Sequence, residues 1–409
     1  MPQSIGMQNG PSRSPRNRRQ RNPRPVLSAF YAAQFGHLGI ILPFLAPWFQ
    51  GRGLEPAAIG VMLALPPLFK ILAPWSWGHW ADRSGRRREL LFVGATVASV
   101  ALVAMTFADR LIVLGFLMAI YAFTRAPVLP YLEATSLEQS EHLDLSYGPI
   151  RLWGSVAFVV LSSGYGVLAK SLHADAGLWI AAVLLALCAV MAVLLPAPDR
   201  SAPRGDDGPS SGARRVTPAP AAGIVRFFAA CALMQVSHGA YYTFYSIHLG
   251  ELGYGTRTIG GLWAVAVVCE VLLLTRMDRI LRRFGTARVL WASLVLAATR
   301  WLIIGSFTGL PWLAVGQTLH AATYAAFHVA AIGVVFRHFG PGARARGQAM
   351  YSGMTFGAGM FVGNLTAGAL AEPLGLPALF LASAGVALVA LVVLGRAGDY
   401  SGPGSERDA

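Results

Sequence analysis

The chain has 409 residues, of which 55% are hydrophobic and only 13% are charged. Soluble domains carry about 25% charged residues, so this composition excludes a soluble globular protein and indicates a polytopic membrane protein. The net charge of +14 follows position: basic residues gather in the tails and in alternate loops, as on the cytoplasmic side of membrane proteins. We therefore predict no nucleic-acid partner.

Apolar stretches long enough to cross a bilayer as a helix, about 20 residues, recur twelve times. The predicted spans are 26–48, 57–80, 89–108, 111–134, 147–168, 177–196, 223–249, 257–275, 286–307, 311–336, 347–370 and 376–396. An even number places both termini on one side, and the basic charge makes that side the cytoplasm. The sequence thus predicts an all-α, multi-pass protein of the inner (plasma) membrane.

Polar segments divide the chain into two halves. Residues 1–25 predict a disordered basic cytoplasmic tail, 197–222 a cytoplasmic linker and 397–409 a second tail. Between them lie an N-terminal bundle at 26–196 and a C-terminal bundle at 223–396. The halves repeat, because Gln34-x-x-His37 recurs as Gln235-x-x-His238, and Ile59-Gly60 recurs as Ile259-Gly260.

A short basic string separates the second and third spans: Gly78-His-Trp-Ala-Asp82-Arg83-Ser-Gly85-Arg86-Arg87-Arg88. Its pattern, G-x-x-x-D-R-x-G-R-R-R, resembles the loop between the second and third helices of major facilitator superfamily transporters. The resemblance implies two pseudo-symmetric six-helix bundles around a central cavity, with the substrate near mid-membrane. It also implies a gating role for Gly78, Asp82, Arg83, Gly85 and Arg86.

Ionisable side chains inside spans are costly unless they are paired or face water, so each is a functional candidate. Eight stand out: Lys70, Arg125, Glu133, Arg151, Glu270, Arg300, His320 and His328. Residues equidistant from a hairpin's loop lie at equal depth, which pairs Glu133 with Arg151 and Glu270 with Arg300. Both a functional site and a structural ion pair predict these contacts.

In the tenth span, His320, Tyr324 and His328 follow at intervals of four, which places them on one helix face. Histidine exchanges protons near neutral pH. We expect no metal, because the two histidines are eight residues apart and the span has no acid. In the first half, the three cations Lys70, Arg125 and Arg151 suit an anionic or multiply hydroxylated ligand. Trp153 is a candidate aromatic wall or ordinary helix packing.

A nearer resemblance rests on Pro130-Tyr-Leu-Glu133 followed by Tyr147-Gly-Pro-Ile-Arg151-Leu-Trp153-Gly154-Ser155. This pattern resembles the proton-coupled symporters around lactose permease, and most closely the branch of 3-phenylpropionic acid transporters. The resemblance implies substrate binding by Glu133 and Arg151, and proton coupling by Glu270 and Arg300. The permease's lysine and acid in the tenth helix are not reproduced, which leaves the final proton carrier open; we expect Glu270.

The sequence is compatible with three functions. We expect proton-coupled symport of a small organic solute (an aromatic or organic acid, or a nucleoside- or sugar-like compound) by alternating access. A drug–proton exporter is the alternative, although Gly164-Tyr-Gly166-Val-Leu-Ala-Lys170 lacks the G-x-x-x-G-P-x-x-G-G string of such exporters. A non-transporting scaffold would have no reason to keep buried charges. We expect no enzyme activity and no cofactor, and a monomer whose partners are substrate, protons and the bilayer.

Overall fold

The computed structural model describes residues 22–143, 146–195 and 222–395. The linker and both tails predicted from the sequence lie outside these ranges, apart from residues 22–25 and 222. The first half contains α1 (Arg24–Gly51), α2 (Pro56–Ser84), α3 (Arg87–Met105), α4 (Leu111–Arg125), α5 (Val128–Leu143), α6 (Tyr147–Leu168) and α7 (Ala176–Leu194). The second half contains α8 (Ala222–Glu251), α9 (Thr256–Leu274), α10 (Met277–Phe284), α11 (Thr286–Ser306), α12 (Leu310–Thr318), η2 (Ala321–Ala326), α13 (Phe327–Phe339), α14 (Arg344–Ser352), η4 (Gly353–Gly359), α15 (Met360–Leu374) and α16 (Leu376–Leu394).

Within the described ranges, 11 helical stretches are long and apolar enough to cross a membrane. They match the predicted spans except the seventh. That span is α8, which has 30 residues but carries Gln235, His238 and several tyrosines among its apolar residues. Gln235, His238, Tyr241 and Tyr245 are buried inside the protein, where neighbouring helices rather than lipid surround them. The count of twelve spans stays a prediction.

Three predicted spans are interrupted. The fourth breaks at Ala126-Pro127, between α4 and α5, because proline has no N–H to donate and its ring clashes with the preceding turn. The tenth and eleventh each contain a π-helical stretch, η2 and η4. Such stretches are frequent at functional sites, and both lie beside the charged residues described below.

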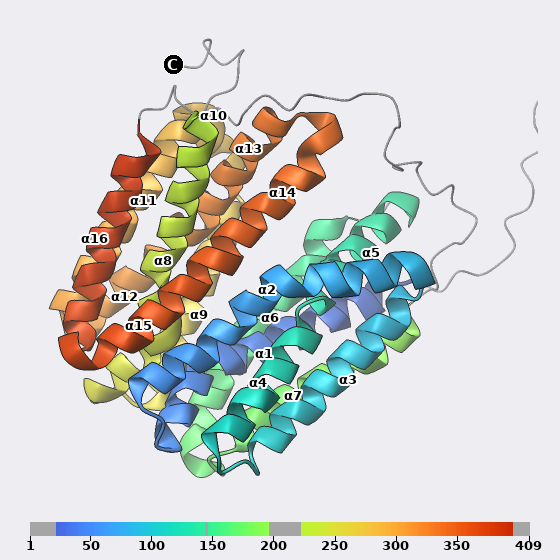
Figure 1. Cartoon of the computed structure of the whole chain (residues 1–409), viewed down its shortest axis with the longest axis horizontal. Helices are drawn as coiled ribbons and strands as arrows, with labels where there is room; N and C mark the ends of the chain where they lie inside the picture. The colour runs from blue at the N-terminus through green and yellow to red at the C-terminus, as the bar shows by residue number, and fades with distance from the viewer. Residues whose placement is uncertain (1–21, 144–145, 196–221, 396–409) are drawn as a thin grey trace, which may run out of the picture.

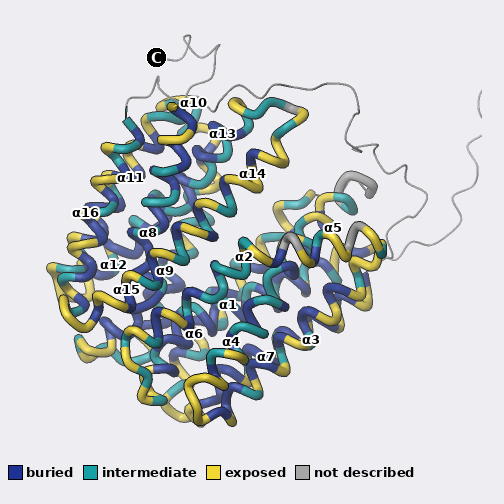
Figure 2. The backbone as a smooth tube through the Cα atoms, in the orientation of Figure 1, coloured by how far each residue is buried: buried dark blue, intermediate teal, exposed yellow. Residues whose placement is uncertain are grey.

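The helices form two bundles, α1–α7 and α8–α16, which touch at one end and splay apart at the other (Figure 1). The touching end, here called the closed end, includes the start of α2 and the end of α15. The splayed end includes the end of α2, α5 and α10. The two largest contacts between bundles join α2 to α15 and α6 to α9. Buried residues line the inside of each bundle, and exposed residues lie on the outside (Figure 2).

Glycines allow the helix crossings at the closed end. A Cβ atom on Gly60 of α2 would lie 2.5 Å from the Cα of Gly368 on α15, and one on Gly260 of α9 would overlap the carbonyl oxygen of Ser162 on α6. The hydroxyl of Thr256 also donates to the carbonyl oxygen of Gly166 across the second crossing, at 2.8 Å. The repeated glycines Gly60 and Gly260 therefore serve the same purpose in both halves.

The repeated Gln-x-x-His pairs lie in the cores of the two bundles. Their side chains are at most 1% exposed. His37 is fully satisfied as a neutral ring, because Nδ1 donates to the Ala181 carbonyl oxygen at 3.2 Å and Nε2 accepts from the Tyr121 hydroxyl at 2.7 Å. This repeat therefore marks helix packing in the first half.

Candidate substrate and proton site

Arg300 is the centre of a polar cluster in the second bundle. It is fully buried, and its guanidinium lies 4.1 Å from the ring centre of Tyr241. Nε donates to the Gly316 carbonyl oxygen at 2.8 Å, Nη1 to Nδ1 of His320 at 2.9 Å, and Nη2 to Oε1 of Gln317 at 3.5 Å. Because a guanidinium only donates, Nδ1 of His320 accepts, and the proton of the neutral ring lies on Nε2.

Glu270 lies on the other side of His320. Its Oε1 is 3.1 Å from Nε2 of His320, but the contact is not aligned as a hydrogen bond. Oε1 is buried and has no hydrogen-bond partner among the described residues. The order is therefore Arg300, His320, Glu270. The predicted direct pair of Glu270 with Arg300 is wrong in this conformation, because the imidazole separates the two charges.

The tenth span carries the remaining predicted proton-coupling residues. The rings of His320 and Tyr324 stack at 5.3 Å between centres, as expected for one helix face. His328 does not continue this stack: its ring contacts Phe356 of η4 at 5.4 Å, and its Nδ1 lies 3.1 Å from the Tyr351 hydroxyl. The intervening π-helical stretch changes the turn of the helix, so spacing by four no longer predicts a shared face.

Arg151 packs against aromatic rings in the first bundle. Its guanidinium carbon lies 3.8 Å from the ring centre of Phe35 and 5.5 Å from that of Tyr31. A Cβ atom on Gly154 would lie 2.9 Å from the Phe35 ring and 3.1 Å from Nη1 of Arg151, so glycine leaves room for the contact between Arg151 and Phe35. No ion pair joins Arg151 to the half-buried Glu133 in the described ranges, and the predicted direct pair is wrong here.

Lys70 bridges the bundles. Its Nζ lies 4.9 Å from the ring centre of Phe356, on η4 of the other half. The side chain is exposed, and no acid of the described residues forms an ion pair with it. A Cβ atom on the neighbouring Gly357 would overlap the side chain of Ile71, which lets α2 approach η4 at this point. Among the described residues, Lys70 therefore contacts an aromatic ring and no acid.

Arg125 and Trp153 differ in how they fit the predicted substrate site. The guanidinium carbon of Arg125 lies 5.5 Å from the Tyr121 ring centre, and its Nε is buried without a hydrogen-bond partner among the described residues. Trp153 is 55% exposed and lies two residues, about 200°, around α6 from Arg151. Trp153 therefore lies on a different side of α6 from Arg151, and its assignment to the substrate site stays a prediction.

The basic string between the second and third spans is mostly helix, where a loop was predicted. α2 continues to Ser84 and α3 begins at Arg87, so only Gly85 and Arg86 connect them. Gly85 has a φ of +63°, which favours glycine. No atom of the described side chains lies within 4 Å of a Cβ placed on Gly78, and Arg83 and Arg86 are exposed. The side chain of Asp82 lies outside what the structure describes.

Sequence reasoning missed the aromatic partners of the cations. Arg151 contacts the ring of Phe35, and Lys70 contacts the ring of Phe356. In the sequence, however, a phenylalanine that binds a cation looks the same as one that only packs between helices. The available signal was a glycine beside each contact, Gly154 and Gly357, where the structure leaves no room for a Cβ.

Comparison with known proteins shows which family this chain belongs to. The sequence profile of the MFS_1 like family matches residues 25–382. The chain belongs to the MFS_1 like family. One relative, the "Probable 3-phenylpropionic acid transporter" of Escherichia coli (strain K12), is 30% identical over 366 residues, covering 87% of this chain and 96% of that protein. The "Maltose permease" of Geobacillus stearothermophilus is 25% identical over 287 residues, covering 68% and 70%.

Solved structures share the fold. The crystal structure of the nucleoside transporter NupG aligns with a TM-score of 0.78 at 18% identity, covering 91% of this chain and 98% of that one. A bacterial homologue of the human lysosomal transporter Spinster aligns with a TM-score of 0.71 at 15% identity, covering 91% and 95%. This member of the MFS_1 like family is therefore a multi-pass membrane transporter with the two-bundle transporter fold.

Proposed function

We propose that this transporter is a proton-coupled symporter of a small organic solute in the inner (plasma) membrane, working by alternating access. The observation that carries the proposal is the order Arg300, His320, Glu270, in which a partly buried carboxylate is the end member and its Oε1 has no hydrogen-bond partner among the described residues. A charged group in such a place is costly unless it has a function.

Glu270 is the proton carrier in this proposal. Protonating His320 at Nδ1 would require it to give up the hydrogen bond from Arg300, whereas Oε1 of Glu270 can take a proton without breaking one. Neutral Glu270 no longer attracts the cations around it. Gain and loss of one proton therefore change how strongly α9 is held to the tenth span, which is the kind of two-state element that coupling needs.

Lys70, Arg125 and Arg151 form the substrate side. An anionic solute is favoured, because Arg151 presents a planar fork to a carboxylate while its other face rests on Phe35. Phe35 and Phe356 would also pack against an aromatic ring. The relative whose name includes 3-phenylpropionic acid supports an aromatic acid as the first compound to test, and nucleosides and sugars follow.

The two sites share one electrostatic environment. Arg151 carries a positive charge in the first bundle and Glu270 a negative charge in the second, and charges interact more strongly inside a protein than in water. A substrate carboxylate bound to Arg151 would neutralise part of that positive field and so favour protonation of Glu270. This mutual dependence links substrate binding to proton binding, as symport requires.

The difference between the two ends of the molecule supports alternating access. If the basic N-terminal tail lies in the cytoplasm, the splayed end faces inward, and the crossings at Gly60 and Gly260 close the outer side. Transport would then require these crossings to part while the splayed end closes. The basic α2–α3 connection, with Asp82, Arg83, Gly85 and Arg86, lies at the end that must close and is proposed to gate it.

Export is the second candidate direction. One relative, the "Putative sugar efflux transporter" of Deinococcus radiodurans, is 24% identical over 351 residues, covering 83% of this chain and 89% of that protein. An antiporter would use the same carboxylate but bind proton and substrate in turn. The direction of proton movement that accompanies substrate separates the two mechanisms.

The test uses purified protein in liposomes. A screen of aromatic acids, nucleosides and sugars for thermal stabilisation identifies a ligand, since binding to the native state raises stability. A gradient of that ligand is then imposed with no pH gradient, and luminal pH is followed with a dye. Symport predicts acidification as ligand enters; antiport predicts alkalinisation. Ligand entry without any luminal pH change beyond that in protein-free liposomes would contradict proton coupling.

A further inference from the structure

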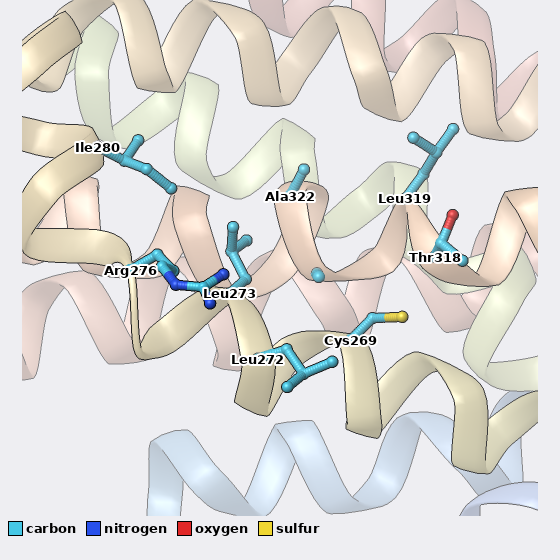
Figure 3. A pocket seen from close by; sticks show the side chains of 9 residues that line it. Cys269, Leu272, Leu273, Arg276, Ile280, Thr318, Leu319 and Ala322 are labelled. Carbon is cyan, nitrogen blue, oxygen red and sulfur yellow. The ribbon is translucent and has the colours of Figure 1, made fainter.

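A groove of about 500 Å³ lies on the second bundle, outside the candidate site. One wall is α9, and the other is formed by α12 and η2 (Figure 3). The groove is lined by Cys269, Leu272, Leu273 and Arg276 on the first side, and by Leu319 and Ala322 among others on the second. Apart from Arg276, these side chains offer little polarity, so the groove suits an apolar occupant.

The groove faces away from the first bundle. Gly260 packs against α6, and Cys269 follows it by nine residues, or about two and a half helical turns. Cys269 therefore lies on the opposite side of α9. Leu272, which shares the groove, is 59% exposed. In a membrane, this surface contacts lipid.

Arg276 lies at the end of the groove, where α9 passes into α10. Its side chain runs back along α9 beside Leu273, in the direction of Cys269 (Figure 3). An arginine at the end of a span normally extends its charge toward the headgroups, and this one points into an apolar groove instead. Among the described residues it has no ion pair or side-chain hydrogen bond. A cation in that position favours an anion beside it.

The surrounding charge supports an anionic headgroup. Arg279, Arg282 and Arg283 of α10 are exposed and follow Arg276 directly, with Asp278 as the one acid in that stretch. Basic pockets between spanning helices on the cytoplasmic side bind anionic lipid headgroups. A lipid phosphate at Arg276 would therefore have further cations within the same interface.

We propose that this groove binds one anionic phospholipid, with the phosphate on Arg276 and an acyl chain along Leu272, Leu273, Leu319 and Ala322. A soluble organic anion would gain little from the apolar walls, and a second copy of this chain would have to bring an anion to Arg276. The groove also adjoins the proton site, since Cys269 precedes Glu270 and Leu319 precedes His320. A bound chain would thus pack between the two helices that hold the buried cluster.

Cys269 reports on the groove directly. It is half-buried, whereas Cys188 and Cys231 are buried, so a small neutral maleimide should react first with Cys269. The full chain is placed in nanodiscs of phosphatidylcholine alone or with phosphatidylglycerol, and the labelling rate is measured by intact mass. We expect labelling about tenfold slower with phosphatidylglycerol when nine-tenths of the sites are occupied.

Two variants make the test specific. Arg276→Gln should abolish the difference between the two lipid mixtures, and Arg288→Gln, which removes an exposed arginine of α11 outside the groove, should retain it. Equal labelling of the wild type in both mixtures would overturn the proposal. So would unchanged protection in Arg276→Gln, protection in pure phosphatidylcholine by inorganic phosphate, or protection that needs two proteins in one nanodisc. None of these readouts depends on transport, so they are independent of the proposed symport.

Discussion

The substitution Gly260→Ala tests how the closed end is held together. The added methyl group would overlap the Ser162 carbonyl oxygen, and it would lie 3.4 Å from the Cα of Gly166. These neighbours are backbone atoms, so no side chain can rotate away and α6 and α9 must separate. Overpacking of this kind costs about 1–3 kcal/mol, and only the conformation with the crossing closed bears the cost. The balance should shift toward the opened crossing by roughly 5–150-fold.

The shift is measurable as a distance. Lys170 and Arg257 lie on opposite bundles at the closed end, and the Lys170 side chain comes within 3.5 Å of a Cβ position on Gly255. Nitroxide labels on cysteines at 170 and 257, with Cys269 replaced by serine, should give a longer pulsed-EPR distance population in Gly260→Ala. Gly261→Ala is the matched control, because no atom of the described part of the chain lies within 4 Å of a Cβ there. Identical distributions in the two variants would refute the reasoning.

Three further predictions concern single side chains. Asp82→Asn removes a negative charge from the basic end of α2 and should slow transport while substrate affinity stays within a few-fold; lost affinity with normal turnover would contradict a gating role. Arg151→Lys keeps the charge but loses the planar fork, so binding measured by calorimetry should weaken at least tenfold, about 1.4 kcal/mol; wild-type affinity would make Arg151 a structural residue. Asp175→Ala removes the acceptor of Trp48 Nε1 at 2.8 Å and Arg52 at 2.9 Å and should destabilise the first bundle by about 2 kcal/mol. An unchanged thermal unfolding midpoint would show that these two bonds contribute nothing.

The positions of the helices were largely predictable because lipid imposes a strong constraint on composition. The last predicted span, 376–396, corresponds to α16 at Leu376–Leu394, and the predicted span 257–275 corresponds to α9 at Thr256–Leu274. α8 shows where that signal weakens: a helix surrounded by protein can carry Gln235 and His238 in its core-facing surface. The hydropathy of such a helix is set by contacts with neighbouring helices rather than by contact with lipid.

Contacts between side chains were less predictable because they depend on helix rotation as well as depth. Counting residues from the loop brought Glu270 and Arg300 to one level, but it could not show that His320 of a third helix lies between them. The π-helical stretch after His320 likewise has no clear mark in the sequence. Arg151 was predicted to pair with an acid, but its guanidinium packs against Phe35. This contact depends on the space left by Gly154.

The most direct test of the account is uptake by Glu270→Gln in liposomes, because glutamine resembles a permanently protonated Glu270 in shape and charge. If Glu270 carries the proton, a pH gradient should no longer drive uphill accumulation of substrate in this variant, while binding and the exchange of labelled for unlabelled substrate persist. Wild-type protein measured in parallel should show proton-driven accumulation as well as exchange. Proton-driven accumulation that survives in Glu270→Gln would contradict the account and place the coupling site elsewhere, with His320 the next residue to test.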